Sequence, residues 1–198
     1  MIQGADFSHY TSHVDFVAYK KGGWTYCFLK ATEGNSNKDA KFPQFWAAAR
    51  AAGVKRGAYH FFHPDIDANV QAKFFLDYMG PLEVGDLAPV LDLEIDGGCD
   101  AADVVKGAIT FLQAVEAGCG KKPYIYASPG FLQSIGNPSA FAAYPLWLAR
   151  YTNVQPIAPK PWAKWVFWQN SESGVAPGVL GHCDTNFFDG TQDELDAL

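Results

Sequence analysis

The chain has 198 residues, a length that fits one domain. Hydrophobic residues make up 48% and charged residues 18% of it, which excludes a disordered chain, and its apolar runs are too short for a transmembrane helix. The net charge of −6 argues against nucleic acid as the main partner, because nucleic-acid backbones attract basic surfaces.

Segments typical of strands and of helices alternate from the N-terminus to Ala127. The expected strands are Ile2–Phe7, Tyr26–Ala31, Arg56–Phe62, Ala88–Leu93 and Pro123–Ala127. The expected helices are Val14–Lys21, Asp39–Ala52, Asp67–Met79 and Ala101–Ala117, with Asp39 and Asp100 as N-caps and Gly53 and Gly118 just past two of the ends. This alternation predicts a parallel sheet with helices packed outside it.

The pattern changes after Ala127. Further strands are expected at Leu146–Arg150, Trp165–Trp168 and His182–Asn186, and the last two links are too short and too rich in Pro, Gly and Ser for full helices. A complete eight-stranded β/α-barrel needs about 250 residues. The sequence therefore predicts a single domain of the α/β class over residues 1–198, an irregular TIM-like β/α-barrel of about eight strands and five helices.

The strongest chemical signal is a pair of acids, Asp92 and Glu94, at the end of the apolar run that starts at Pro89. Residues two apart on a strand face the same side, about 6.6–7 Å apart. In a parallel barrel the carboxyl ends of the strands form the active face. Two carboxylates in one cavity repel each other, so the pKa of one should rise and keep it protonated as a catalytic acid. A surface carboxylate pair or a metal site would give the same pattern.

Other expected strands also carry acids, namely Asp6, Glu33 and Asp184. Each alone would fit a cap or a turn, but together with the pair above they predict one acidic cleft. The four cysteines have no zinc-site spacing, and we expect them to be free thiols. No pair of histidines completes a metal-binding pattern, so we expect neither a metal nor a cofactor.

Aromatic residues are frequent, at 15% of the chain, and several lie at the same strand ends. They are Tyr59, Tyr126, Trp147 and Tyr151, and Gln169 follows the tryptophan that ends the seventh expected strand. Each of them would also fit core packing. Together with the acids they favour a carbohydrate ligand, because aromatic rings stack on the apolar faces of sugars.

Eight segments in this order resemble glycoside hydrolase family 25, the Chalaropsis-type lysozymes. They are Gly4–Ser8, Lys30–Gly34, Gly57–Phe61, Pro89–Glu94, Tyr124–Tyr126, Leu146–Tyr151, Trp168-Gln169 and Asp184–Phe187. The resemblance implies an irregular barrel of five helices and eight strands that hydrolyses the β-1,4 bond between N-acetylmuramic acid and N-acetylglucosamine in peptidoglycan. The chain departs from the family at Thr11, where Gln is frequent, and at Asn170, where Tyr is frequent.

The resemblance also implies a role for each acid. Glu94 matches the general acid, and Asp92 and Asp184 match carboxylates that hold the acetamido group of the substrate or stabilise the charged intermediate. Asp6 matches a further acid at the floor of the cleft.

The remaining site residues are expected to bind the substrate. They are Tyr59, Tyr126, Trp147, Tyr151, Glu33 and Gln169. Trp147 and Tyr151 are expected to be partly exposed in the cleft.

The expected partner is bacterial cell-wall peptidoglycan, bound by a monomer that needs neither nucleic acid nor membrane. The first residues do not have the features of a signal peptide, so either the protein is made without one or this sequence begins after it; nothing after Asn186 predicts a separate wall-binding module. We therefore expect action at the bacterial cell wall, either extracellular or after release from a host cell.

The substrate carries an acetamido group beside the reacting carbon, so we predict that its oxygen attacks that carbon and that the products retain the β configuration. Inversion stays open if Glu94 and its partner lie about 6.5–9.5 Å apart. Two other functions stay open as well. One is a sugar-binding barrel that has lost catalysis. The other is a chitinase-like glycosidase. That class carries additional acids on its catalytic strand, and the stretch before Asp92 lacks them, as Gly85, Ala88 and Val90 show.

Overall fold

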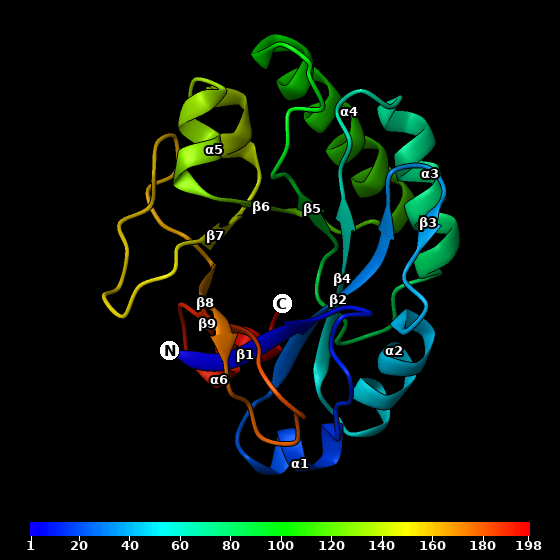
Figure 1. Ribbon diagram of the computed structural model, residues 1–198, viewed down its shortest axis with the longest axis vertical. Helices are drawn as coiled ribbons and strands as arrows, with labels where there is room; N and C mark the ends of the chain where they lie inside the picture. Colours follow the sequence, from blue (N-terminus) through cyan, green and yellow to red (C-terminus); the bar gives the residue numbers. More distant parts are fainter.

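Nine strands form one sheet, and eight of them close into a barrel in the computed structural model, which describes residues 1–198 (Figure 1). They are β1 (Ile2–Phe7), β2 (Tyr26–Glu33), β3 (Asn37–Lys38), β4 (Lys55–Phe61), β5 (Val90–Asp92), β6 (Tyr124–Ala127), β7 (Leu146–Ala149), β8 (Phe167–Gly174) and β9 (Cys183–Phe188). The order around the barrel is β1-β9-β8-β7-β6-β5-β4-β2, and pairing of β1 with β2 closes it. The predicted irregular barrel is therefore confirmed, and β3 is a short antiparallel extension of β2.

One strand runs against the others. Neighbours from β1 through β2 and β4 to β8 are parallel, whereas β9 is antiparallel to both β8 and β1. The link from β8 to β9 is short, and a parallel return needs a crossover of about a dozen residues or more. The parallel arrangement predicted for the strands up to Ala127 therefore does not extend to β9. Asp184 is the second residue of β9 and pairs in register with Asp6, so it still lies at the rim where the parallel strands end.

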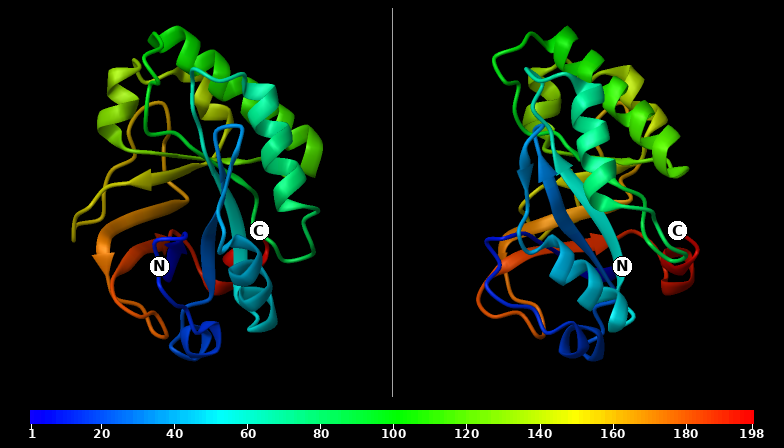
Figure 2. Two further views of the ribbon diagram at one scale, coloured as in Figure 1. Left: turned by 45° about the vertical axis from the view of Figure 1, so that its right-hand side comes forward. Right: turned by 90° about the vertical axis from the view of Figure 1, so that its right-hand side faces the viewer.

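The helices cover only part of the barrel. They are α1 (Phe16–Lys21), α2 (Phe42–Ala51), α3 (Ala68–Met79), α4 (Ala101–Cys119), α5 (Pro129–Ser134) and α6 (Gln192–Asp196), with a 3-10 helix η1 at Ser139–Ala143. Figures 1 and 2 show α2, α3 and α4 along one side, while irregular chain covers the side of β7 and β8. None of the helices has the length and the apolar character needed to cross a membrane.

The predicted N-cap Asp100 is confirmed, whereas the predicted N-cap Asp39 is not. Asp67 and Asp100 cap α3 and α4 through hydrogen bonds from backbone N–H groups of the first turn. Asp39, however, does not cap α2, which begins only at Phe42. Its carboxylate instead accepts hydrogen bonds from the backbone N–H and the ring Nδ1 of His9, both at 2.8 Å. The other carboxylate oxygen, Oδ1, accepts a hydrogen bond from the backbone N–H of Lys41 at 2.9 Å, so Asp39 joins His9 to the segment before α2 without capping the helix.

Helix α4 continues past the glycine that was expected to end it. Gly118 lies within the helix, which ends at Gly120 with a φ of 74°. A Cβ atom at Gly118 would lie 2.4 Å from a methyl group of Leu76 on α3. Gly118 thus permits close packing of two helices, and Gly120 supplies the left-handed conformation that stops α4.

The barrel interior is a packed aromatic cluster. Large rings from five strands fill it, namely Tyr26, Phe28, Tyr124, Tyr126, Trp147, Phe167 and Phe188. Phe28 and Trp147 stack with ring centroids 4.3 Å apart. A larger core of 39 buried residues lies between the sheet and its surrounding segments. Because the interior is filled, ligands can reach the barrel only at its rims. All four cysteines are free thiols, as expected.

A buried ion pair joins segments at the opposite end of the barrel. The Arg56 side chain is 2% exposed, and its Nε lies 2.8 Å from Oδ1 of Asp86. The same guanidinium contacts Glu83 at 3.1 Å and lies 4.0 Å from the ring centroid of Trp46.

We expect Arg56→Met to destabilise the fold by about 3–5 kcal/mol, because the substitution leaves Asp86 buried without its partner. Urea unfolding would measure the change. Lys73→Met is the matched control, because it breaks an exposed pair with Asp77 and should cost at most about 1 kcal/mol. Equal losses for the two variants would contradict the expectation.

Candidate active site

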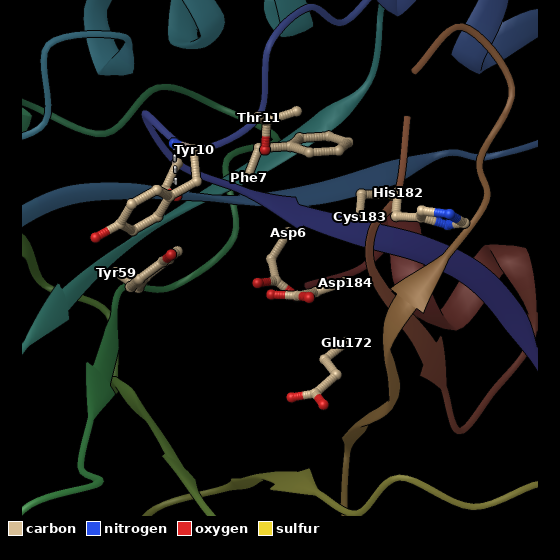
Figure 3. Close-up of a pocket in the computed structure, with 10 residues that line it drawn as sticks. Asp6, Phe7, Tyr10, Thr11, Tyr59, Glu172, His182, Cys183 and Asp184 are labelled. Atoms are coloured by element: carbon tan, nitrogen blue, oxygen red, sulfur yellow. Dashed lines mark hydrogen bonds between the residues drawn. The ribbon is translucent and has the colours of Figure 1, made fainter. Parts of the chain in front are cut away.

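Four acidic side chains meet at the rim where the parallel strands end. Asp6 lies near the end of β1 and Asp184 near the start of β9, while Asp92 ends β5 and Glu94 follows it. Two cavities of about 290 and 60 Å³ share Asp6, Tyr59 and Asp184 in their walls, so they form one cleft. Figure 3 shows the carboxyl groups of Asp6 and Asp184 side by side in the larger cavity. The structure therefore brings the four acids together as the sequence predicts.

The first pair of acids combines a buried and a more accessible carboxyl group. Asp6 is only 6% exposed, and its Oδ2 accepts hydrogen bonds from Nε2 of Gln169 at 2.9 Å and Nδ2 of Asn186 at 2.7 Å. Burial, followed by the negative charge of Asp184, raises the pKa of Asp6 well above its ordinary value. Partial burial also raises the pKa of Asp184. Burial and mutual repulsion therefore both favour the protonated form within this pair.

The second pair has the same design on the other side of the cleft. Asp92 is buried, and its carboxyl group lies within hydrogen-bonding reach of Glu94. Burial, followed by the charge of Glu94, raises the pKa of Asp92 well above its ordinary value. Glu94 reaches solvent, yet the cleft walls remove part of the water around its carboxyl group, which raises its pKa as well. The predicted upward shift within this pair is confirmed.

One oxygen of the second pair has no partner. Oδ1 of Asp92 is buried and accepts no hydrogen bond. Such a buried acceptor is costly unless a donor reaches it. Because Asp92 lines the smaller cavity, a ligand there is placed to supply that donor.

Two buried amides connect the acids to the aromatic walls. Oε1 of Gln169 accepts hydrogen bonds from the hydroxyls of Tyr126 at 2.6 Å and Tyr151 at 3.1 Å, which leaves Nε2 to donate to Asp6. Oδ1 of Asn186 accepts from Nε1 of Trp147 at 2.8 Å, which leaves Nδ2 for the same carboxyl group. These contacts fix the orientation of both amides, and so the position of Asp6.

The aromatic residues of the cleft differ in exposure. Tyr151 is 51% exposed, as expected, but it lies outside the lining of both cavities and contacts the cleft through its hydroxyl on Gln169, whereas Tyr59 lines both cavities and is half-buried. Trp147 is only 2% exposed, so the expectation of a partly exposed indole is wrong. Its ring stacks on Phe28 in the barrel interior, and its indole N–H donates a hydrogen bond to Asn186. Tyr126 is also buried. Both Trp147 and Tyr126 nevertheless line the smaller cavity.

Glu33 lies outside the two cavities. Its carboxylate binds Nζ of Lys30 at 2.6 Å and Nε2 of His63 at 3.2 Å. Lys30 was not predicted from the sequence, although it lies two residues after Phe28 and so shares the inward face of β2. Its positive charge lowers the pKa of Asp92 and of Glu94, against the larger effect of burial.

Other cleft residues were also missed. Asn186 follows Asp184 by two positions on β9, so strand alternation is the signal that could have found it. Seven further residues line the larger cavity, which Figure 3 draws, namely Phe7, Ser8, Tyr10, Thr11, Glu172, His182 and Cys183. Tyr10 is 83% exposed, and its ring lies 3.9 Å from that of His9. It therefore offers an accessible aromatic surface at the edge of the cleft.

His60, which belongs to the segment Gly57–Phe61, stabilises the fold and does not line the cleft. It is buried, its ring nitrogens contact Thr32 at 2.7 Å and Gln71 at 3.1 Å, and it stacks on Phe111. Burial lowers the pKa of His60 to about 3. No group of three or more His, Cys, Asp or Glu side chains is placed to hold a metal ion.

Comparison with known proteins gives a consistent result. The model of the family "Glycosyl hydrolases family 25" matches residues 5–179. The Uncharacterized protein YegX of Escherichia coli is 36% identical over 202 residues, which cover 100% of this chain and 73% of that protein. The N,O-diacetylmuramidase of Chalaropsis sp is 34% identical over 213 residues, covering 100% of this chain and 98% of the relative. The solved structure of the bacterial lysozyme from Streptomyces coelicolor has a TM-score of 0.95 at 30% identity, covering 100% of this chain and 96% of that one.

We expect Lys30 and Glu33 to shift the pH dependence of the site in opposite directions. Lys30→Met removes a positive charge that lowers the pKa of Glu94, so Glu94 should stay protonated to higher pH. Glu33→Gln removes the carboxylate that compensates Lys30, so Glu94 should lose its proton at lower pH. The alkaline limb of kcat should therefore move up for the first variant and down for the second. A shift in the same direction for both variants would count against this role of the ion pair.

Proposed function

The chain belongs to glycosyl hydrolases family 25 and is a lysozyme that hydrolyses peptidoglycan, and from this premise we propose which residues carry out each step. The bond that is cleaved is the β-1,4 bond between N-acetylmuramic acid and N-acetylglucosamine. We expect the enzyme to act as a monomer, because a single chain supplies all four acids of the cleft. The site of action is the bacterial cell wall, where the substrate is found.

Glu94 donates the proton to the glycosidic oxygen of the leaving sugar. A general acid has to be protonated at the working pH and has to reach the substrate. Glu94 suits this role, because partial burial shifts its pKa in the direction that favours the protonated form and its side chain reaches solvent within the cleft. Asp92 and Asp6 are buried and Asp184 is less exposed than Glu94, so Glu94 is the acid best placed to reach the glycosidic oxygen.

Asp92 binds the N–H of the substrate's acetamido group through Oδ1. The absence of any other partner for that buried oxygen is the observation that carries this assignment. A hydrogen bond from the N–H favours the ionised form of Asp92, so the proton of the pair is then held by Glu94. Binding of the substrate thus sets the protonation state that catalysis needs.

The reaction follows from this arrangement. The acetamido oxygen attacks the anomeric carbon while the bond to the leaving oxygen breaks and Glu94 delivers its proton. The resulting bicyclic oxazolinium ion carries a positive charge, which the nearby carboxylate of Asp92 stabilises. Water then attacks the same carbon and gives its proton to Glu94, so the sugar retains the β configuration and the acid is restored.

The second acid pair acts from the other side of the cleft. Asp184, the more accessible member, contacts the bound sugar, and Asp6 positions Asp184 from below. Gln169 and Asn186 in turn hold Asp6 through their amide groups. We assign the more exposed aromatic side chains of the cleft, Tyr59 and Tyr151, to stacking on the sugar rings.

Glu94→Gln tests the assignment of the acid. The substitution preserves size but removes the proton, and general acid catalysis is worth about 10²–10⁴-fold. We expect the rate of reducing-end release from purified peptidoglycan to fall by this factor. Glu172→Gln is the matched control in the same cleft and should retain most of the activity. A Glu94→Gln enzyme that folds normally and keeps near wild-type activity would falsify the assignment.

The anomer formed first tests the neighbouring-group mechanism. Proton NMR during rapid hydrolysis should detect the β-anomer of the new reducing end before mutarotation, and no sugar ester should form on an aspartate. An α-anomer as the first product would establish inversion. A trapped glycosyl ester on Asp92 or Asp184 would show that this carboxylate, and not the acetamido oxygen, is the nucleophile.

A further inference from the structure

A groove with no role in the steps above lies on the same rim as the cleft. Its volume is about 360 Å³, and Arg150 is the one charged side chain in its lining. Pro129, Val154 and Ile157 contribute apolar surface to its walls. The groove therefore combines a single cation with an apolar wall.

The segments that line the groove directly follow strands that line the cleft. Arg150 directly follows β7, and Pro129 begins the helix that follows β6. These two strands also carry Trp147 and Tyr126 of the cleft. Tyr151, the next residue after Arg150, donates its hydroxyl to Gln169 inside the cleft. A ligand that leaves the cleft past Tyr151 thus meets the groove.

The wall of the groove is held in place by the barrel. The indole N–H of Trp168 donates to the carbonyl oxygen of Arg150 at 2.6 Å, and that of Trp165 donates to the carbonyl oxygen of Pro156 at 2.9 Å. Apolar side chains nevertheless point into solvent here, since Val154 is 74% and Ile157 is 93% exposed. A fixed wall that exposes apolar side chains is typical of a binding surface.

The charge of the groove differs from that of the cleft. The chain has three arginines, of which Arg50 and Arg56 form ion pairs, whereas Arg150 is exposed and forms none. The acids of the cleft repel a carboxylate of the substrate, and the ammonium of Lys30 is already bound by Glu33. An anionic part of the substrate is therefore attracted to Arg150.

Peptidoglycan has such an anionic part. Its muramic acid carries a lactyl group from which a short peptide extends, with alanine methyl groups and free carboxylates. We propose that the groove binds this peptide, with a peptide carboxylate on the guanidinium of Arg150 and the alanine side chains against Val154 and Ile157. The inference rests on the proposed function, because it assigns the groove to the same substrate. It makes the groove a determinant of preference for peptide-bearing glycan.

Paired substrates test the proposal. One consists of soluble glycan strands that keep their peptides, and the other consists of the same strands after an amidase has removed the peptides and left the lactyl carboxylate. We expect Arg150→Met to raise KM about tenfold on the peptide-bearing strands, with little change in kcat, because a charge-assisted hydrogen bond is lost. On stripped strands KM should stay at the wild-type value.

Three further variants sharpen the test. Arg150→Lys keeps the charge and should restore most of the affinity. Lys106→Met removes an exposed cation on α4 that forms no ion pair, and it should leave both KM values unchanged. Val154→Asp places a negative charge in the groove and should raise KM on the peptide-bearing strands alone. Thermal unfolding would verify that each variant is folded, and the two independent groove variants guard against failure of either one.

Several outcomes would overturn the proposal. An equal rise in KM on both substrates for Arg150→Met would mean that Arg150 binds the lactyl carboxylate instead of the peptide. If the KM values of the groove variants on peptide-bearing strands matched the KM of Lys106→Met, the groove would not bind the substrate. If the wild-type enzyme released reducing ends from neither substrate, the proposed function itself would fail, and the inference with it.

Discussion

The burial of acidic groups at one rim of the barrel is the constraint on which the rest of the site depends. An isolated carboxylate out of water is costly, so each buried acid needs a proton, a hydrogen-bond donor or a cation. Asp6 accepts hydrogen bonds from two side-chain amides. Asp92 lies close enough to Glu94 for the two carboxyl groups to share a proton. Lys30 adds a positive charge nearby. The groups that lower the free-energy cost of burying these acids also determine which acid holds a proton when a sugar binds.

The aromatic interior supplies the rigid base for this arrangement. Phe28 and Trp147 stack below the cleft, and the indole N–H of Trp147 reaches Asn186 on a different strand. Asn186 then contacts Asp6 on β1, while Gln169, its paired neighbour on β8, donates to the same carboxylate oxygen. Packing and polar contacts therefore form one continuous network across the barrel. An indole that takes part in this network cannot also be an exposed sugar platform.

Much of the barrel and the positions of its acids could be predicted from sequence, because apolar strands that end in carboxylates give a strong local pattern. The direction of β9 could not, since it depends on how a short link closes the ring. Asp184 was thus placed at the correct rim, although it begins its strand instead of ending it. Lys30 and Asn186 follow from strand alternation, but only once the inward face is known. The burial of Trp147 and the groove at Arg150 depend on contacts between distant segments, which no local pattern contains.

The raised pKa values also connect catalysis with stability. Asp6 and Asp92 have pKa values in the fold above those of the unfolded chain, chiefly because of burial. For such a group the contribution to stability is fully present below the unfolded pKa and is lost as the pH rises through the folded pKa. These acids therefore stabilise the fold least under conditions where they ionise. A core of 39 buried residues and the interior aromatic cluster offset this cost. The cleft can keep acids poised to exchange protons because the rest of the barrel does not depend on them for its stability.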